Sequence, residues 1–144
     1  MSTETIAIAV DHGGVVLKDA AIEEVRRSGR EVIDLGTDSE ESVDYPDYAE
    51  KLVREMADGN ADRGILICGT GIGISIAANR HPGIRAALCY DEDTAALARQ
   101  HNDANVLCMG GRKTGEALAR EIVKIFLETP FEGGRHARRV GKMG

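Results

Sequence analysis

Short apolar runs rich in β-branched residues alternate along the chain with segments whose apolar positions recur at helical spacing. The apolar runs predict strands at Thr5–Val10, Glu31–Leu35, Arg63–Cys68, Arg85–Tyr90 and Asn105–Met109. A strand that is buried on both faces of a sheet has a near-continuous apolar sequence, and the third run is the most apolar of the five. We therefore expect the third run at the centre of a sheet.

The segments between these runs predict helices. Apolar residues recur on one face between positions 15 and 28, and Gly29 follows where a helix would end. Comparable apolar stripes predict four more helices, at 48–56, 74–79, 93–101 and 113–128.

Five strands, each followed by a helix, predict a parallel sheet with helices on both faces. With right-handed crossovers this is a doubly wound, Rossmann-like three-layer α/β sandwich, and the favoured strand order is 2-1-3-4-5. We find no internal repeat and no linker that divides the chain. A single domain over residues 1–144 is therefore expected, with residues 131–144 as a basic tail.

The composition narrows the classes of partner. Hydrophobic residues make up 42% and charged residues 29%, as in ordinary soluble proteins. No apolar run approaches the roughly 20 residues that span a bilayer. The polar start, Met1–Thr5, does not resemble a signal peptide, so we expect a cytoplasmic protein without a membrane partner. A net charge of −6 disfavours nucleic-acid binding, which needs a positive field over a broad face.

Basic residues gather in the tail at 131–144, where Glu132 is the only acidic residue. Arg135 and Arg139 are four residues apart, so a helical turn would place both on one face with His136 alongside. Two guanidinium groups on one face suit a phosphate. Three roles remain open for this tail. It could bind a small anionic ligand, dock on an acidic surface, or simply be solvated.

Ligands of doubly wound sheets bind beyond the carboxyl ends of the strands, where the strand order reverses. Asp11-His12-Gly13-Gly14 follows the first strand, and Cys68 with the glycine loop 69–73 follows the third. Gly110-Gly111-Arg112 follows the fifth. The point where the strand order reverses is called the switch point. With the expected order it lies between the first and third strands, so the polar residues that follow these strands should meet there.

The residues at these strand ends exclude three familiar uses of the architecture. A dinucleotide-binding fold needs G-x-G-x-x-G after the first strand, where this chain has Asp-His-Gly-Gly. A phospho-accepting receiver domain needs an aspartate where Cys68 stands. A small cysteine phosphatase has an arginine six residues after its cysteine, where this chain has Ile74.

Cys68 is followed by alternating glycines that lead into a predicted helix. Such glycines let the backbone turn its N–H groups toward one point, which makes a cradle for an anion. The positive end of the helix favours a thiolate, so Cys68 is a candidate base or nucleophile. A cysteine at a strand end is by itself more often a small buried hydrophobe, but the adjoining loop favours a functional role here.

The other two cysteines, Cys89 and Cys108, lie inside predicted strands, where packing explains them. Three cysteines far apart, with no C-x-x-C or Cys/His ligand spacing, indicate neither a disulfide framework nor a zinc site. We therefore expect no metal.

Four other polar residues can be interpreted in two ways. Asp11 and His12 suit a turn, but two polar residues at the switch point favour function. His101 and Asn102 near the end of a predicted helix are as compatible with a helix cap as with a site.

Five segments, in the same order along nearly the whole chain, resemble ribose-5-phosphate isomerase B. They are DHGG after the first strand, DYP at 44–46, ICGTGIGISIAAN at 67–79, RQHNDANVL at 99–107 and GGRHARRV at 133–140. The wider family includes the two-subunit galactose-6-phosphate isomerase. The resemblance implies an aldose–ketose isomerase of the pentose phosphate pathway that interconverts ribose 5-phosphate and ribulose 5-phosphate. The reaction would pass through an enediolate, without a metal or other cofactor.

The resemblance also implies roles for individual residues. Cys68 would be the base that moves a proton between C2 and C1, while Thr70 and His101 would open the furanose ring. The enediolate oxygen would be stabilised by the backbone of Gly69, Gly71, Ile72 and Gly73 with the side chain of Asn102. The phosphate would be held by His12, Arg112, Arg135 and Arg139. Asp11 would contact sugar hydroxyls, and Tyr45 and His136 would line the site.

The predicted helix that bears His101 starts near the carboxyl edge of the sheet and runs away from it. About nine residues at ~1.5 Å each carry His101 roughly 13 Å toward the opposite edge. A partner subunit must then supply His101 to Cys68, which agrees with a family of homodimers with shared sites. The sequence leaves open whether two dimers pair into a tetramer.

Two alternatives remain open. One is an isomerase of hexose 6-phosphates such as allose or galactose 6-phosphate. The other is a non-catalytic sugar-phosphate-binding subunit, which the intact Cys68, Thr70 and His101 disfavour.

Overall fold

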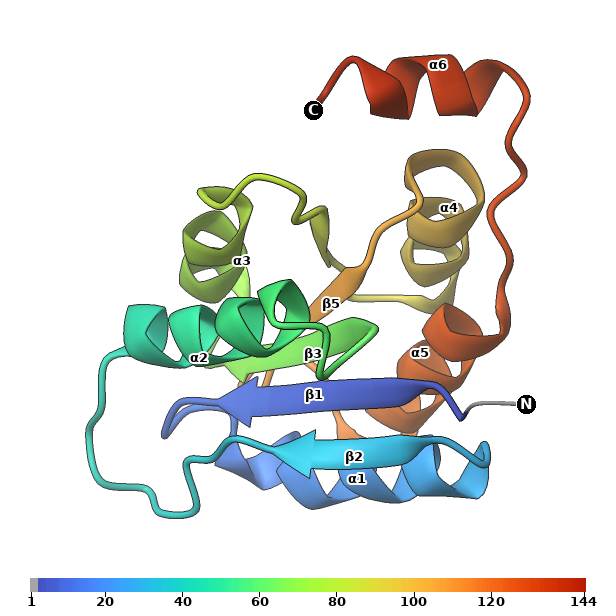
Figure 1. Cartoon of the computed structure of the whole chain (residues 1–144). Coiled ribbons are helices and arrows are strands. Elements are labelled where there is room, and N and C mark those ends of the chain that lie inside the picture. The colour runs from blue at the N-terminus through green and yellow to red at the C-terminus, as the bar shows by residue number, and fades with distance from the viewer. Residues whose placement is uncertain (1–2) are drawn as a thin grey trace.

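The computed structural model describes residues 3–144 and shows a parallel sheet between two layers of helices (Figure 1). The strands are β1 Thr5–Val10, β2 Glu31–Asp34, β3 Arg63–Cys68, β4 Ala86–Leu88 and β5 Val106–Gly110. The helices are α1 Val15–Arg27, α2 Tyr45–Ala57, α3 Ile72–Asn79, α4 Glu92–Asn102, α5 Glu116–Glu128 and α6 Arg135–Gly141. The predicted three-layer α/β fold is confirmed. Met1 and Ser2, part of the polar start discussed above, lie outside the described residues.

The strand order is β2-β1-β3-β5-β4, so the predicted order of the last two strands was wrong. All five residues of β5 are buried, whereas β4 has three residues that are only half-buried. The short, less buried strand therefore takes the edge, and the longer apolar strand pairs with β3. β1 and β3 are neighbours, so the switch point lies between them as predicted.

Right-handed crossovers with this strand order place α1, α4 and α5 on one face of the sheet and α2 and α3 on the other. Side chains of β3 alternate between the two resulting cores. Ile65 and Ile67 pack in the core beneath α1, α4 and α5, whereas Leu66 and Cys68 pack in the core beneath α2 and α3. The alternation therefore fixes the face on which the Cys68 thiol lies.

Helix α5 begins at Glu116, whereas the sequence predicted a start at residue 113. Gly115 has an extended backbone, with φ −72° and ψ 161°, and ends the turn that precedes the helix. In that turn the N–H groups of Lys113 and Thr114 both donate to the Gly110 carbonyl, at 3.0 Å. Arg112 is consequently on a loop at the carboxyl edge of the sheet, near the switch point.

The chain after α5 leaves the body of the domain along α4. The Glu132 N–H donates to the carbonyl of Gln100 at 3.1 Å, and Arg99 donates to the carbonyl of Thr129 at 3.2 Å. Helix α6 then lies beyond α4, away from the sheet (Figure 1). Across residues 3–144, no helix has the length and apolar character to cross a bilayer.

Candidate active site

Three loops meet at the switch point through backbone contacts that only glycine permits. A Cβ on Gly13 would lie 2.8 Å from the Gly69 nitrogen, and a Cβ on Gly111 would lie 2.1 Å from the Gly13 carbonyl oxygen. The Gly111 N–H also donates to the Cys68 carbonyl at 2.8 Å, and the Arg112 N–H to the Gly69 carbonyl at 2.9 Å. The loops after β1, β3 and β5 are therefore locked together around one point.

Cys68 is the last residue of β3, and its side chain faces the start of α3. Its Sγ atom accepts a hydrogen bond from the Gly71 N–H at 3.1 Å. Gly71 has φ +80°, a left-handed conformation that suits glycine, and this turns its N–H back toward the sulfur. Cys68 itself is 4% exposed. The thiol is thus held by the glycine loop.

The other two cysteines are in different surroundings. Burial raises the pKa of the Cys89 thiol to about 11, with the nearby Asp91 charge adding to the shift. Complete burial raises the pKa of the Cys108 thiol well above its ordinary value. Both groups remain protonated near neutral pH, which agrees with their interpretation as packing residues.

Asp11 and His12 follow β1 at the same point. Asp11 is buried, and its Oδ1 atom accepts the Gly13 N–H at 2.8 Å, so it shapes the loop that approaches Gly69. The Nδ1 atom of His12 accepts the N–H of Val43 at 3.1 Å. The neutral ring must then carry its proton on Nε2, which leaves a hydrogen-bond donor for a ligand.

Arg112 and Tyr45 lie against the glycine loop from two sides. The Nη1 atom of Arg112 is 2.9 Å from the position that a Cβ on Gly69 would take. The Tyr45 ring, at the start of α2, is 2.6 Å from the corresponding position on Gly73. Both glycines thus leave room for a neighbouring polar side chain, and these side chains flank the cradle.

Two contacts in this region involve residues that the sequence analysis did not select. The hydroxyl of Tyr90 donates to the Thr70 carbonyl at 2.6 Å, which ties the glycine loop to the segment after β4. Val43 orients His12, as described above. Both act from segments distant in sequence, and the one available signal was the position of Tyr90 as the last residue of a predicted strand.

His101 and His136 form a second cluster with Glu132. The two imidazole rings are stacked, with centroids 4.3 Å apart and planes at 11°. Glu132 Oε1 lies 3.9 Å from Nε2 of His101 and 3.8 Å from Nε2 of His136. Burial lowers the pKa of His136, and the charges of His101 and Arg135 add to this against the opposing carboxylate of Glu132. A neutral His136 is therefore favoured near neutral pH.

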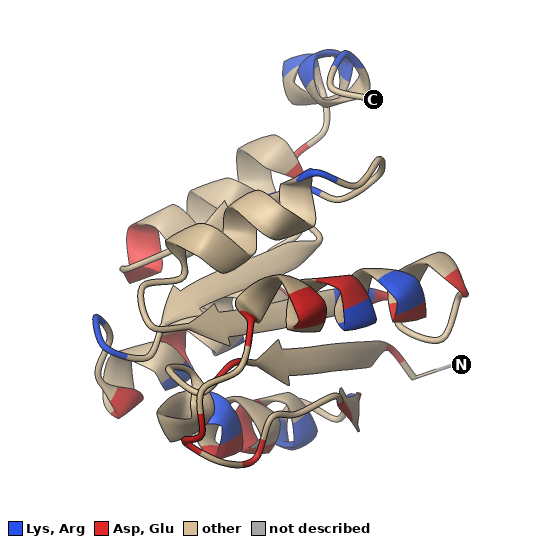
Figure 2. Cartoon of the chain, turned by 90° about the vertical axis from the view of Figure 1, so that its left-hand side faces the viewer, with Lys and Arg blue, Asp and Glu red and all other residues tan. Residues whose placement is uncertain are grey.

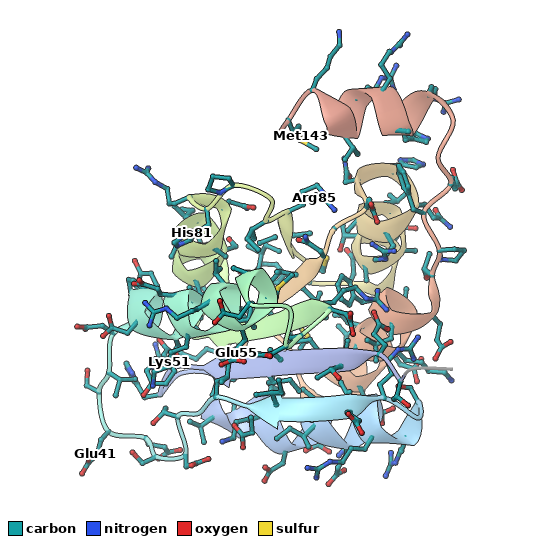
Figure 3. All side chains as sticks on the ribbon, viewed as in Figure 1. Glu41, Lys51, Glu55, His81, Arg85 and Met143 are labelled. Carbon is teal, nitrogen blue, oxygen red and sulfur yellow. The ribbon has the colours of Figure 1, made fainter. Side chains whose placement is uncertain are left out.

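The remaining basic candidates lie on α6. Arg135 and Arg139 are exposed in this helix, which has Arg138 but no acidic residue (Figure 2). Asn102, at the end of α4, lines a cavity of about 660 Å³ together with Arg85 and Met143. Figure 3 shows Met143 below α6, on the side that faces Arg85.

The predicted site residues thus fall into two groups that a single chain does not bring together. The switch-point group comprises Asp11, His12, Tyr45, Cys68, Gly69, Thr70, Gly71, Ile72, Gly73 and Arg112. The α4–α6 group comprises His101, Asn102, Arg135, His136 and Arg139. Helix α6 packs on α4, away from the loops at the carboxyl edge (Figure 1).

A thiol at a strand end, held by a glycine loop at the switch point, defines a doubly wound α/β protein with a candidate site at the carboxyl edge of its sheet. Comparison with known proteins makes this specific. Residues 6–143 match the Ribose/Galactose Isomerase family, and the chain belongs to that family. The expected enzyme class, isomerase, is thereby confirmed.

Individual relatives cover nearly the whole chain. Ribose-5-phosphate isomerase B of Escherichia coli is 51% identical over 135 residues, which is 94% of this chain and 91% of that protein. The type B ribose 5-phosphate isomerase of Trypanosoma brucei superposes with a TM-score of 0.95 at 52% identity, covering 99% of this chain and 97% of that one. For the ribose 5-phosphate isomerase of Thermotoga maritima the TM-score is 0.94 at 56% identity, over 99% and 98% of the chains.

Proposed function

We propose that the protein interconverts ribose 5-phosphate and ribulose 5-phosphate, with Cys68 as the base. The observation that carries this proposal is the hydrogen bond from the Gly71 N–H to the Cys68 sulfur at the switch point. It places a thiol beside the N–H groups of a glycine loop, where a negatively charged intermediate can be bound. The names of the relatives in Escherichia coli and Trypanosoma brucei supply the substrate.

In the proposed reaction, the Cys68 thiolate removes the proton from C2 of the open-chain sugar. The enediolate that forms carries its charge on oxygen, and the N–H groups of Gly69, Gly71 and Gly73 would stabilise it. Preorganised donors of this kind supply on the order of 3 kcal/mol each. The proton of the O2 hydroxyl passes to O1, so that C2 becomes the carbonyl, and the Cys68 thiol returns its proton to C1, which completes the isomerisation. Thr70 and His101 would act earlier, as the acid and base that open the furanose ring.

The substrate phosphate would be bound from two directions. His12 offers its Nε2–H, because Nδ1 accepts the Val43 N–H, and Arg112 lies beside the same loop. Arg135 and Arg139 would complete the binding site from α6. The basic tail at 131–144 therefore contributes to phosphate binding in this proposal, and Asp11 and Tyr45 contact the sugar.

A complete site needs two copies of the chain. The α4–α6 group lies apart from the switch-point group within one chain, so His101 and Asn102 of the partner subunit would face Cys68. A homodimer with two shared sites satisfies this requirement by symmetry. A cytoplasmic location and a place in the pentose phosphate pathway are parts of the same proposal.

The test is an isomerase assay of the purified protein with ribose 5-phosphate, with allose 6-phosphate and galactose 6-phosphate as hexose competitors. Cys68→Ala should lower kcat/KM by roughly 10²–10⁴-fold, the usual contribution of a general base. Cys89→Ala removes a buried thiol elsewhere and should retain activity. A Cys68→Ala variant with normal turnover would assign the base to another group.

The same assay separates the alternatives. Because the family name pairs ribose with galactose, hexose 6-phosphate isomerisation is the second candidate, and faster turnover of a hexose 6-phosphate would establish it. Binding of these sugars without turnover would indicate a binding subunit. Activity that a chelator abolishes and added metal restores would contradict the proposed mechanism, which uses no metal.

A further inference from the structure

His101, Glu132 and His136 bring three potential metal ligands close together. One ligand atom from each residue lies within 4.8 Å of the other two. Glu132 Oε1 lies 3.9 Å from Nε2 of His101 and 3.8 Å from Nε2 of His136. These residues come from the last turn of α4, the linker between α5 and α6, and the first turn of α6.

The backbone and the ring stacking hold this cluster in place. The Glu132 N–H is bonded to the Gln100 carbonyl at 3.1 Å, next to His101 in sequence. His136 is only 8% exposed, and its ring lies parallel to that of His101 at 4.3 Å. The three residues are therefore kept close together before any ion binds, and binding requires only that one ring leaves the stack.

The donor set selects a class of metal. Two imidazole nitrogens and one carboxylate oxygen suit Zn²⁺ and related transition metals, and Mg²⁺ and Ca²⁺ prefer oxygen ligands alone. Bonds of about 2.0–2.2 Å place the ligands of a tetrahedral zinc ion about 3.4 Å apart. The Glu132 separations of 3.8 and 3.9 Å exceed this by about half an ångström, and one imidazole must also turn out of the parallel stack so that both Nε2 lone pairs face the ion.

The surrounding charges make Glu132 the critical ligand. Arg135 and Arg139 are on the same short helix as His136, and their positive charges oppose the approach of a cation. Within the cluster, Glu132 is the one group that brings a negative charge. Its exchange for glutamine removes that charge and one strong ligand, and it leaves both histidines in place.

We propose that His101, Glu132 and His136 bind a divalent transition metal ion of the zinc type, and that the bound ion inhibits the enzyme. Inhibition follows because the metal occupies Nε2 of His101, the atom that would otherwise exchange protons with the sugar. This second half of the proposal rests on the proposed isomerase function, and metal binding itself does not. The ion is an inhibitor here and takes no part in catalysis.

Binding is tested by titrating the Cys68→Ala protein with Zn²⁺ in a calorimeter, a background in which the candidate thiol cannot compete. We expect one strong site per chain. Glu132→Gln on this background should weaken binding by roughly tenfold or more, in line with losses at metal sites. Glu121→Gln, an exposed acid on α5, is the matched control and should bind as the parent does. Circular dichroism of each variant verifies folding.

Two results would overturn the binding site. One is the absence of Zn²⁺ binding to the Cys68→Ala protein, and the other is equal affinity in the Glu132→Gln variant.

Inhibition is tested with the protein that retains Cys68. Zn²⁺ should inhibit turnover of ribose 5-phosphate, a chelator should restore it, and Glu132→Gln should need roughly tenfold more Zn²⁺ for half-inhibition. Equal inhibition of the Glu132→Gln enzyme would place the inhibitory ion elsewhere and overturn the proposal. If the protein isomerises no sugar phosphate yet binds Zn²⁺ through Glu132, the proposed function fails and the metal site stands.

Discussion

His12 is oriented by a residue that is distant in the sequence. Its Nδ1 atom accepts the N–H of Val43, which lies in the loop between β2 and α2. The start of this loop is anchored by Lys18 of α1, which is 4% exposed and paired with Asp34 at 3.2 Å and with Asp38. Lys18 thus ties α1 to the start of the loop whose Val43 N–H sets the tautomer of His12, a candidate phosphate ligand.

We expect Lys18→Met to weaken phosphate recognition more than chemistry. Without the ammonium group the loop loses its anchor and the Val43 N–H is placed less accurately. KM for ribose 5-phosphate should then rise severalfold with a smaller change in kcat, and stability should fall by about 1–2 kcal/mol. Steady-state kinetics and urea unfolding measure the two effects. An unchanged KM would show that Lys18 does not affect substrate binding.

The pH dependence of the Lys18 contribution has a definite sign. Burial opposes its charge, but hydrogen bonds from the ammonium group to Asp38 and Asp34 outweigh this and raise the pKa above the usual 10.5. A raised pKa in the folded state stabilises the protein fully below the unfolded value and loses that effect as pH rises through the folded value. The stability difference between wild type and Lys18→Met should therefore persist at neutral pH and shrink only in strong alkali.

At the scale of elements, Glu4 joins several of them at the amino edge of the sheet. Its carboxylate accepts hydrogen bonds from Arg30 at 2.6 Å, ahead of β2, and from Arg63 at 2.7 Å, at the start of β3. Arg63 also donates to the carbonyls of Phe126 and Leu127, at the end of α5, at 3.0 and 3.1 Å. One carboxylate therefore holds the edge opposite the active site.

Glu4→Gln should destabilise the protein in a pH-dependent way. Burial opposes ionisation of Glu4, but bonds and charges from Arg63 and Arg30 outweigh it and lower its pKa below the usual 4.5. The stabilisation is therefore present above that value and lost as pH falls through the folded pKa. Urea unfolding should show a loss of about 1–2 kcal/mol at neutral pH that shrinks as the pH falls below 4.5.

Glu50→Gln provides the control for this experiment. Glu50 forms an exposed pair with Arg54 on α2 at 3.1 Å, and such pairs contribute less than about 1 kcal/mol. It should show little loss at either pH. A Glu4→Gln loss that does not change between neutral and acid pH would refute the assigned role of the charge.

Strand bounds follow from local sequence signals, whereas the order of the strands in the sheet does not. The periodicity placed β1 and β3 with their observed bounds, because apolar alternation and flanking polar residues are local signals. The order of β4 and β5 could not be derived in this way. It depends on which strand buries more of itself against β3, a comparison between distant segments.

In the candidate site, too, arrangements within one local motif could be predicted, whereas contacts between distant loops could not. Cys68 and Gly71 are three residues apart, so their contact belongs to one strand–loop–helix motif, and the sequence predicted a glycine-loop cradle beside this thiol. The contacts of Val43 with His12 and of Tyr90 with Thr70 join loops 31 and 20 residues apart. Their partners are set by the tertiary fold, and no local pattern encodes them.

For the whole molecule, the separation of the two groups of site residues leads to a mixing experiment. Cys68→Ala affects the switch-point group and His101→Ala the α4–α6 group. In a mixed dimer with shared sites, one site carries both defects and the other carries none. Statistical mixing of equal amounts should then restore about a quarter of wild-type activity, measured after the chains are dissociated and reassociated together.

A second mixture of variants tests whether mixing alone restores activity. Cys68→Ala and Thr70→Ala both affect the switch-point group, so every site in their mixed dimer retains one defect and no activity should return. Recovery in the first mixture alone supports shared sites. No recovery in either mixture, with mixed dimers verified by mass spectrometry, would show that each chain builds its own site.

The position of α6 beyond α4 also has a consequence for kinetics on dilution. If half of each site belongs to another molecule, then a folded monomer is inactive although its sheet and helices are intact. Below the dissociation constant of the dimer, the measured rate should increase with the square of the chain concentration, while the far-ultraviolet circular dichroism per chain stays constant. The cell would then set the activity of this protein through its abundance as well as through its substrate.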